Sequence, residues 1–265
     1  KPLNFFNLKL NLPESELFMA FYRITYNEKY RFATLHNYGC TFHCSFCSYK
    51  LRSGADGRPG FAEPRPEKFL SVEEQKTALR NIDIDKLYFM GGEPTVAPEL
   101  PDMLRFGKTE LNVMTKLGHT NGSKLPLPYL DGANVGFKAW SDELHLQITG
   151  RPKSLIYDNF QRAFDSGMSM AANMVFIPGK ADLDELAGLV NFLAHLSPEI
   201  PFHIMGYIPV PGEPYRRPTP EELTAAQQLA LSCLKQVAVS SLSSAEALDL
   251  TSRDDRFNVK IIAGV

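Results

Sequence analysis

Three of the four cysteines, Cys40, Cys44 and Cys47, lie in one short stretch with the spacing C-x3-C-x2-C. A loop of this length can turn three thiolates toward one centre, and thiolate sulfur suits iron–sulfur clusters and zinc. Three ligands around a four-iron cluster leave one iron open, and an open metal site can do chemistry where a closed one is structural. The spacing therefore predicts a metal centre held by these three side chains.

A structural zinc site is the alternative. The three cysteines together with His43 or His36 could form a Cys3His site. Small zinc sites usually draw two ligand pairs from separate turns, and the sequence contains no second pair. The motifs that follow the cysteines in the chain must therefore distinguish an iron–sulfur cluster from a zinc site.

Alternating strand and helix patterns predict a parallel α/β fold around this loop. A hairpin is expected at Asn27-Glu28, which aromatic and β-branched residues flank. Buried strands are expected at residues 31–37, 85–90, 111–120, 134–139, 168–177 and 202–208. Capping signals predict helices over residues 71–82, 154–166 and 182–197 and from Thr219 onward. The cysteine stretch begins just past the first of these strands, at the edge that is reactive in such folds.

The composition limits the possible functions. A chain of 265 residues, 44% of them hydrophobic, suits one large α/β domain or barrel. The net charge of −2 provides no basic excess, so nucleic-acid binding is not expected. Apolar runs such as residues 174–178 are far too short to span a membrane. Cys233 is alone in a helical stretch, so we expect no disulfides and a reducing, cytoplasmic location.

A second motif, Gly91-Gly92-Glu93-Pro94, follows the strand expected at residues 85–90. Two glycines allow a ligand to approach the backbone, whose amide and carbonyl groups can bind charged ends of that ligand. Glu93 or a nearby carbonyl could accept a hydrogen bond from an ammonium group. An ordinary turn is the alternative, but this motif and the cysteines fall on the same predicted edge of the sheet.

The two motifs together resemble the radical S-adenosylmethionine (radical SAM) superfamily, including aromatic Phe46 just before the last cysteine. The resemblance extends from Phe32 to Ala238 and implies a partial (β/α)6 TIM-like barrel with an N-terminal hairpin extension. It divides the chain into an extension (1–31), the barrel (32–240) and a C-terminal extension (241–265). In the last part, residues 257–262 could form a barrel-closing strand.

The resemblance also implies the cofactors. In this superfamily the open iron of a [4Fe–4S] cluster chelates the amino and carboxylate groups of S-adenosylmethionine, and the electron of the cluster cleaves the sulfonium. The products are methionine and a 5′-deoxyadenosyl radical. By the same resemblance the ligands are Cys40, Cys44 and Cys47, and the cofactor-binding residues include Phe46, Gly91, Gly92 and Glu93.

The order of the later motifs resembles the activating enzymes of glycyl radical enzymes, such as that of pyruvate formate-lyase. Thr120-Asn121-Gly122 matches a D-T-N-G strand end, with His119 in place of the aspartate that belongs to a small cation site. Lys138 matches the lysine of D-L-K, which approaches the carboxylate and ribose region of the cofactor, whereas Gly136 replaces the aspartate. His145 and Thr149-Gly150 continue the match.

Three further strand ends follow this pattern with changes. Asn173 stands where relatives carry an arginine near the cofactor carboxylate, and asparagine can donate a hydrogen bond but no charge. The Ile-Pro-Gly turn that ends at Gly179 matches, but Ile208 replaces a histidine that meets the ribose. Arg216 and Arg217 could bind an anionic substrate group or remain in solvent.

The implied activity is reductive cleavage of S-adenosylmethionine at a single [4Fe–4S] cluster, followed by hydrogen abstraction from a substrate. The electron would come from a flavodoxin- or ferredoxin-like reductant, and no catalytic side chain beyond the ligands is expected. The substrate would be a glycine of a partner glycyl radical enzyme or, alternatively, a small molecule, a cofactor precursor or another protein residue. A zinc-stabilised binding module and an electron carrier are the non-enzymatic alternatives. The long loop of residues 50–70 is expected to cover the substrate or contact a partner.

Overall fold

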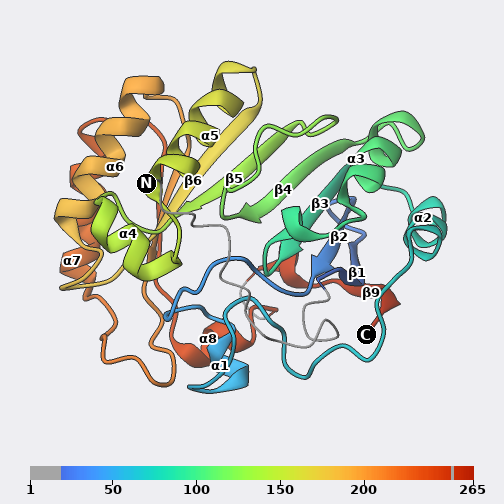
Figure 1. Cartoon of the computed structure of the whole chain (residues 1–265), viewed down its shortest axis with the longest axis horizontal. Helices are drawn as coiled ribbons and strands as arrows, with labels where there is room; N and C mark the ends of the chain where they lie inside the picture. The colour runs from blue at the N-terminus through green and yellow to red at the C-terminus, as the bar shows by residue number, and fades with distance from the viewer. Residues whose placement is uncertain (1–18, 252–253) are drawn as a thin grey trace, which may run out of the picture.

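The computed structural model describes residues 19–251 and 254–265. These residues form one sheet, whose strands are β1 (Phe21–Asn27), β2 (Phe32–Asn37), β3 (Lys86–Gly91), β4 (Met114–Thr120), β5 (Gly132–Phe137), β6 (Ser169–Phe176), β7 (Phe202–Gly206), β8 (Val237–Ser240) and β9 (Lys260–Gly264). Across the sheet the order is β8-β7-β6-β5-β4-β3-β2-β1-β9 (Figure 1). Neighbours from β2 to β8 are parallel, whereas β1 pairs antiparallel with both β2 and β9.

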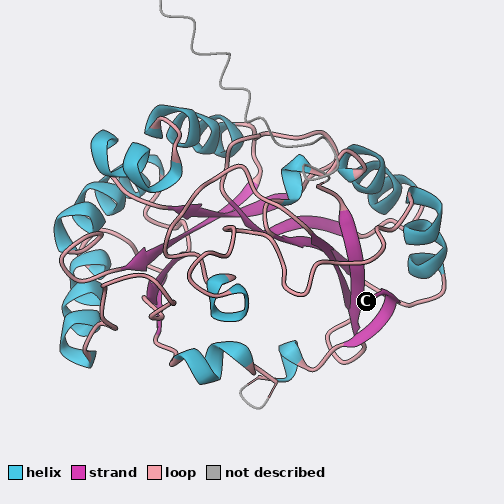
Figure 2. Cartoon of the chain, turned by 60° about the horizontal axis from the view of Figure 1, so that its bottom comes forward, coloured by secondary structure: helices cyan, strands magenta, loops and turns pink. Residues whose placement is uncertain are grey.

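The helices lie on two sides of this curved sheet. They are α1 (Lys50–Ser53), α2 (Val72–Arg80), α3 (Leu100–Thr109), α4 (Asp142–Thr149), α5 (Lys153–Asp165), α6 (Leu183–Leu196), α7 (Pro220–Leu231) and α8 (Ser244–Leu248), with the 3-10 turns η2 (Pro94–Val96) and η3 (Asp255–Phe257). The longer helices follow the convex side, and the short α1 and α8 lie on the open, concave side (Figures 1 and 2). None of the helices in the described residues combines the length and the apolar composition of a membrane span.

The two faces of the sheet differ in chemistry because side chains alternate along each strand. Toward the helices, the strands present a core of buried apolar residues such as Leu35, Phe89, Val135 and Phe137. The opposite positions form what we call the concave face: Arg23, His36, Met90, Gly136, Asn173 and His203, which pair with one another across the strands. The fold thus separates an apolar layer from a polar concave face.

The parallel α/β fold and the six predicted strands are confirmed, as is the hairpin, whose β1 and β2 pair around Asn27. The capping boxes at Ser71 and Thr219 begin α2 and α7 as expected. The sequence does not predict the seventh parallel strand, β8, because a run of four residues is too short to show a periodic pattern. The division into an extension, a barrel and a second extension stays a prediction.

The expectation of a barrel-closing strand at residues 257–262 is wrong. The strand begins at Lys260 and pairs with β1, while β8 lies at the other edge, so the described strands form an open sheet. Between these edges the chain passes through α8 and η3 on the concave side (Figure 2). The end of this connection, just before β9, is held by Asn27, whose Nδ2 donates to the carbonyls of Asp255 (2.8 Å) and Asn258 (3.2 Å).

The aromatic core under α5 and α6 gives a stability prediction. Phe137 is fully buried, with its ring 4.7 Å from that of Tyr157 and 5.2 Å from that of Phe160. Replacing Phe137 by alanine should lower the free energy of unfolding by about 3–5 kcal/mol, because it leaves a cavity in a packed core. Denaturant unfolding followed by the fluorescence of Trp140, the only tryptophan, measures this change.

Leu146→Ala is the matched control, because this leucine side chain on α4 is 54% exposed. It should change the free energy of unfolding by no more than about 0.5 kcal/mol. Equal effects of the two substitutions would contradict the packing described for Phe137.

Candidate functional site

The cysteine loop, residues 38–50, leaves the carboxyl end of β2 and rests on two neighbouring segments. Gly39 N donates to Gly60 O (2.9 Å), and Glu93 N donates to Gly39 O (2.8 Å). The Asn37 side chain, which is fully buried, donates to the carbonyls of Gly39 (3.0 Å) and Glu93 (2.9 Å). The loop is therefore attached both to the end of β3 and to the long loop that follows α1.

Close backbone contacts explain the glycines at this position. A Cβ on Gly92 would lie 2.1 Å from Gly39 O and 2.3 Å from Gly60 O. Gly91 has a φ of +113°, and a Cβ there would lie 2.3 Å from Asn37 O. The glycines predicted to admit a ligand thus serve first to let three backbone segments meet.

The loop after α1 contributes directly to this packing. A Cβ on Gly60 would lie 2.3 Å from the Cβ of Cys40. Phe61 is buried with its ring edge-on to Tyr38, 5.0 Å away, and the Arg58 guanidinium lies over Phe61. Residues 60 and 61 therefore support the cysteine loop, so deleting residues 50–70 would disturb the loop as well as any substrate cover.

Glu93 is the polar centre of the strand ends. Its side chain is fully buried, and Oε1 accepts from Thr95 N (3.1 Å), Thr95 Oγ1 (2.7 Å) and Thr120 Oγ1 (2.8 Å). Oε2 accepts from Asn121 N (2.5 Å). Burial raises the pKa of this carboxyl, and the hydrogen bonds oppose that rise. The carboxylate thus joins the ends of β3 and β4.

Asn121 connects β4 to the cysteine loop. Its Nδ2 donates to Thr41 Oγ1 (3.2 Å) and lies 3.9 Å from Cys40 Sγ, while its Oδ1 accepts from Ser123 N (2.9 Å). The Thr120 hydroxyl donates to Glu93 and accepts a hydrogen bond from Gly122 N (3.1 Å). The structure places both predicted residues at the site, with contacts to the protein itself.

The far side of the cysteine loop is fixed by α4 and by the segment after β7. His43 N donates to Thr149 O (3.3 Å), at the end of α4. Glu213 accepts from Ser45 Oγ (3.0 Å) and forms a largely buried ion pair with Lys50 (3.8 Å). No sequence motif identifies Glu213, because this residue lies in a proline-rich segment without a recognisable pattern.

The three thiols lie in the same loop, but their sulfur atoms do not converge on one point in the described structure. Cys47 N donates to Cys44 O (3.0 Å), which makes a turn, and Cys40 Sγ accepts from Phe42 N (3.4 Å). Burial, with the nearby Glu93 charge, raises the pKa of Cys40 to about 12, and burial raises the pKa of Cys44 to about 11. Among residues 19–251 and 254–265, no three His, Cys, Asp or Glu side chains are arranged to hold a metal ion.

Lys138 and Asn173 both lie beside Gly136 on the concave face. Gly136 lies between them, since a Cβ there would lie 2.8 Å from Lys138 Nζ and 3.2 Å from Asn173 Oδ1. Asn173 donates to Asn134 Oδ1 (2.9 Å), but its own buried Oδ1 has no hydrogen-bond partner within the described part of the chain. Lys138 has no ion pair there either. A buried acceptor beside an unpaired cation suits a zwitterionic amino-acid ligand.

The same face holds neutral histidines. Burial, with the Lys138 and His203 charges, lowers the pKa of His119 to about 4. Burial and the Arg23 charge lower the pKa of His36 to about 3, and Thr25 Oγ1 lies 2.9 Å from His36 Nε2. Neither histidine therefore supplies charge near neutral pH, and His119 does not replace the carboxylate of a cation site.

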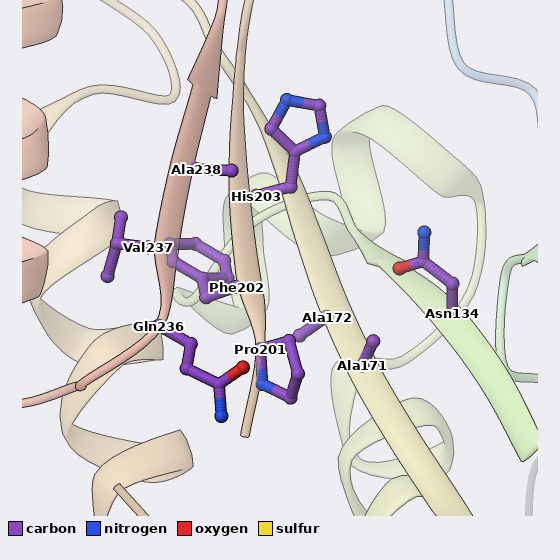
Figure 3. A pocket seen from close by; sticks show the side chains of 9 residues that line it. All are labelled: Asn134, Ala171, Ala172, Pro201, Phe202, His203, Gln236, Val237 and Ala238. Carbon is purple, nitrogen blue, oxygen red and sulfur yellow. The ribbon is translucent and has the colours of Figure 1, made fainter. Parts of the chain in front are cut away.

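Two hollows lie away from the cysteine loop. One, of about 390 Å³, is lined by residues that include Asn134, His203 and Gln236, at the amino-terminal ends of β5 to β8 (Figure 3). It reaches the concave face at Asn134, the hydrogen-bond acceptor of Asn173, whereas the cysteine loop is at the carboxyl ends of the strands. The other, of about 810 Å³, includes Arg216. That arginine pairs with Glu222 (2.6 Å) in acidic surroundings, and Arg217 donates to Ser241 Oγ (3.1 Å), so neither arginine is poised for an anion.

Comparisons with known proteins find one matching family model and several similar proteins. The family model described as the radical SAM superfamily matches residues 34–193. The chain is 25% identical over 216 residues to a candidate glycyl-radical enzyme activating enzyme of Methanocaldococcus jannaschii, covering 78% of this chain and 80% of that protein. It is 26% identical to an S-adenosylmethionine-dependent nucleotide dehydratase of Flammeovirga pacifica, covering 66% of this chain and 61% of that protein.

Among solved structures, a radical SAM methyltransferase from Sphaerobacter thermophilus is similar in fold. The TM-score is 0.57 at 20% identity, and the match covers 78% of this chain and 66% of that chain. This chain spans four fifths of the archaeal relative but less than two thirds of the dehydratase and of the methyltransferase. Because its sequence identity to this chain is only 20%, the methyltransferase supports the partial-barrel architecture alone.

Glu93→Gln tests whether the buried carboxylate holds the strand ends together. An amide in this place turns an NH2 group toward one of the hydrogen-bond donors, so it should lower the free energy of unfolding by about 1–3 kcal/mol. Chemical denaturation measures the change. Glu110→Gln, which removes an exposed ion pair with Arg80, should cost no more than about 1 kcal/mol, and equal costs would contradict the role of Glu93.

His36 gives a pH-dependence prediction. Its folded-state pKa of about 3 lies below its ordinary value of 6.5, so its contribution to stability is present above pH 6.5 and lost as pH falls toward 3. Between about pH 7 and about pH 5, the metal-free wild-type chain should lose about 2 kcal/mol more unfolding free energy than His36→Gln. Denaturant titrations at both pH values measure this difference. His195→Gln, on the exposed face of α6, should keep the wild-type dependence; the same dependence in His36→Gln would refute the assignment.

Proposed function

Because the chain belongs to the radical SAM superfamily, we propose that it reductively cleaves S-adenosylmethionine at one [4Fe–4S] cluster held by Cys40, Cys44 and Cys47. The bound cluster and S-adenosylmethionine would supply a 5′-deoxyadenosyl radical that takes a hydrogen atom from the substrate. The observation that carries this proposal is a three-thiol loop at the carboxyl edge of a parallel sheet, fixed by the neighbouring strand ends.

The donor set fits such a cluster. Thiolate sulfur is the ligand of iron–sulfur clusters, and hydrogen bonds to sulfur stabilise the thiolate form. Phe42 N and Asn121 Nδ2 are within reach of Cys40 Sγ, and the positive Lys138 favours the thiolate of Cys44. These groups would offset part of the burial that favours neutral thiols.

The concave face fits the methionyl end of S-adenosylmethionine. Lys138 would pair with its carboxylate, and the unpartnered Oδ1 of Asn173 would accept a hydrogen bond from a donor of the cofactor. Both oxygens of Glu93 are occupied by Thr95, Thr120 and Asn121, so the backbone at Gly91 and Gly92 would bind the ammonium group. Phe46 is buried and would pack beside the cluster.

We propose a glycine of a partner glycyl radical enzyme as the source of the hydrogen atom. The similarity to the archaeal candidate activating enzyme supports this, as do Lys138, His145 and Thr149-Gly150 in the order typical of that branch. One electron would come from a flavodoxin- or ferredoxin-like protein, and four unpaired cysteines fit a reducing, cytoplasmic setting.

A small-molecule substrate is the second candidate. The similarity to a protein named as a nucleotide dehydratase favours it, as do the departures from the activating-enzyme pattern at His119, Gly136 and Ile208. Either substrate would require the same cleavage of S-adenosylmethionine, so one assay tests the step that the two proposals share.

The test uses protein purified and reconstituted without oxygen, reduced, and mixed with S-adenosylmethionine. The wild-type chain should bind about four irons and form 5′-deoxyadenosine, since three thiolates suffice for a cluster with one open iron. Cys40→Ala, Cys44→Ala and Cys47→Ala should each lose most of the iron and all detectable 5′-deoxyadenosine.

Cys233→Ala is the matched control, because Cys233 lies next to Ser232 and Asn191, away from the loop. It should retain wild-type iron and product. Zinc in place of iron in the wild-type chain, without 5′-deoxyadenosine, would instead support the zinc-stabilised binding module.

A further inference from the structure

Arg23 is a cation on the concave face that the proposed chemistry does not use. It lies in β1, outside the matched residues 34–193, so it does not belong to the shared family region. Arg23 stands opposite His36 in the antiparallel pair, and Thr25 contacts His36 on the same face. The register shift between Phe21 and Arg23 allows Phe21 to enter the core while Arg23 points to the polar side.

In residues 19–251 and 254–265, the guanidinium of Arg23 has no counter-charge. Its Nε is buried without a hydrogen-bond partner, and no carboxylate pairs with it there. The titratable groups beside it are Tyr22, whose ring centroid lies 5.4 Å from the guanidinium carbon, and His36, which faces it across the strands. Neither is anionic near neutral pH, because burial raises the pKa of Tyr22 and lowers that of His36 to about 3. The Tyr22 ring offsets part of the cost of burying the cation but supplies no negative charge, so the partly buried guanidinium remains costly unless a ligand provides an anion.

The position of Arg23 relative to the cysteine loop suggests which ligand this is. Arg23 faces His36 near the end of β2, from which the cysteine loop leaves, and it lies over the ring of Tyr22. The Tyr22 ring in turn is 6.5 Å from that of Tyr38, at the start of the cysteine loop. Arg23 therefore lies on the β1 side of the cysteine loop, whereas Lys138 follows β5 on the other side. If Lys138 takes the carboxylate of S-adenosylmethionine, Arg23 is left for a second anion.

We propose that Arg23 binds an anionic group of the substrate, a carboxylate or a phosphate, and thereby holds the substrate on the β1 side of the concave face. The planar guanidinium forms paired hydrogen bonds with either group, which a lysine in its place would not reproduce. This inference deepens the proposed function, on which it rests, by naming the chemical class of the substrate. A peptide substrate would satisfy it through an acidic side chain close to the reacting residue.

The test is equilibrium dialysis of the cluster-loaded, oxidised chain, saturated with S-adenosylmethionine so that Lys138 is already occupied. Radiolabelled inorganic phosphate and radiolabelled succinate are the two probes, at constant ionic strength. The wild-type chain should bind about one equivalent of at least one probe, and Arg23→Gln should bind it about 10- to 100-fold more weakly. Binding of phosphate alone would assign a phosphate group, and binding of succinate alone would assign a carboxylate.

Two further variants complete the test. Arg31→Gln removes an exposed arginine that pairs with Asp83 and Asp85, and it should bind the probe like the wild type. Arg23→Lys keeps the charge without the planar geometry, so its affinity should fall between those of the wild type and Arg23→Gln; it also serves if Arg23→Gln fails to fold. Equal binding by the wild type and both Arg23 variants, or binding of neither probe by the wild type, would overturn the proposal. Absence of 5′-deoxyadenosine from the reduced wild-type chain would overturn the proposed function instead, because the dialysis does not depend on cleavage.

Discussion

The position of the cysteine loop depends on the buried Glu93 carboxylate and the glycine backbone beside it. Glu93 accepts four hydrogen bonds from Thr95, Thr120 and Asn121, which fixes the end of β4 against the end of β3. Gly92 then packs against the carbonyls of Gly39 and Gly60 at distances that no Cβ would permit. Because a buried carboxylate without partners would be strongly unfavourable, the strand ends and the carboxylate stabilise each other.

This arrangement explains how one motif can serve both fold and chemistry. The side chain of Glu93 is turned into the protein, so its backbone neighbours are the part of the motif that can meet a ligand. The apolar layer under the helices provides the stability, while the concave face carries polar groups that lack partners among the described residues. Arg23 and Lys138 have no carboxylate partner there, and Asn173 Oδ1 has no hydrogen-bond partner, as is expected of groups at functional sites.

The sequence predicts the fold well wherever periodicity is strong. The six longer parallel strands and the capped helices α2 and α7 follow from alternation and from Ser71 and Thr219, which act locally. The strand β8 and the pairing of β9 with β1 could not be predicted in this way, because strand order depends on contacts between distant segments. Motif spacing likewise places Cys40, Glu93, Asn121 and Lys138 at one edge of the sheet. Motif spacing does not reveal that the Glu93 carboxylate is fully hydrogen-bonded by the protein itself. Nor does it reveal that Arg23 points to the concave face, because that direction depends on a register shift in β1.

The proposed chemistry requires that three cysteines hold a four-iron cluster with one iron left open to S-adenosylmethionine. Mössbauer spectroscopy of the chain reconstituted with ⁵⁷Fe, before and after S-adenosylmethionine is added, tests this most directly. With three thiolate ligands, the signal of about one iron in four should change when the amino and carboxylate groups bind, while the other three irons keep their thiolate signature. A spectrum that is unchanged by S-adenosylmethionine, or one that shows four equivalent thiolate-ligated irons in both states, would contradict this ligation.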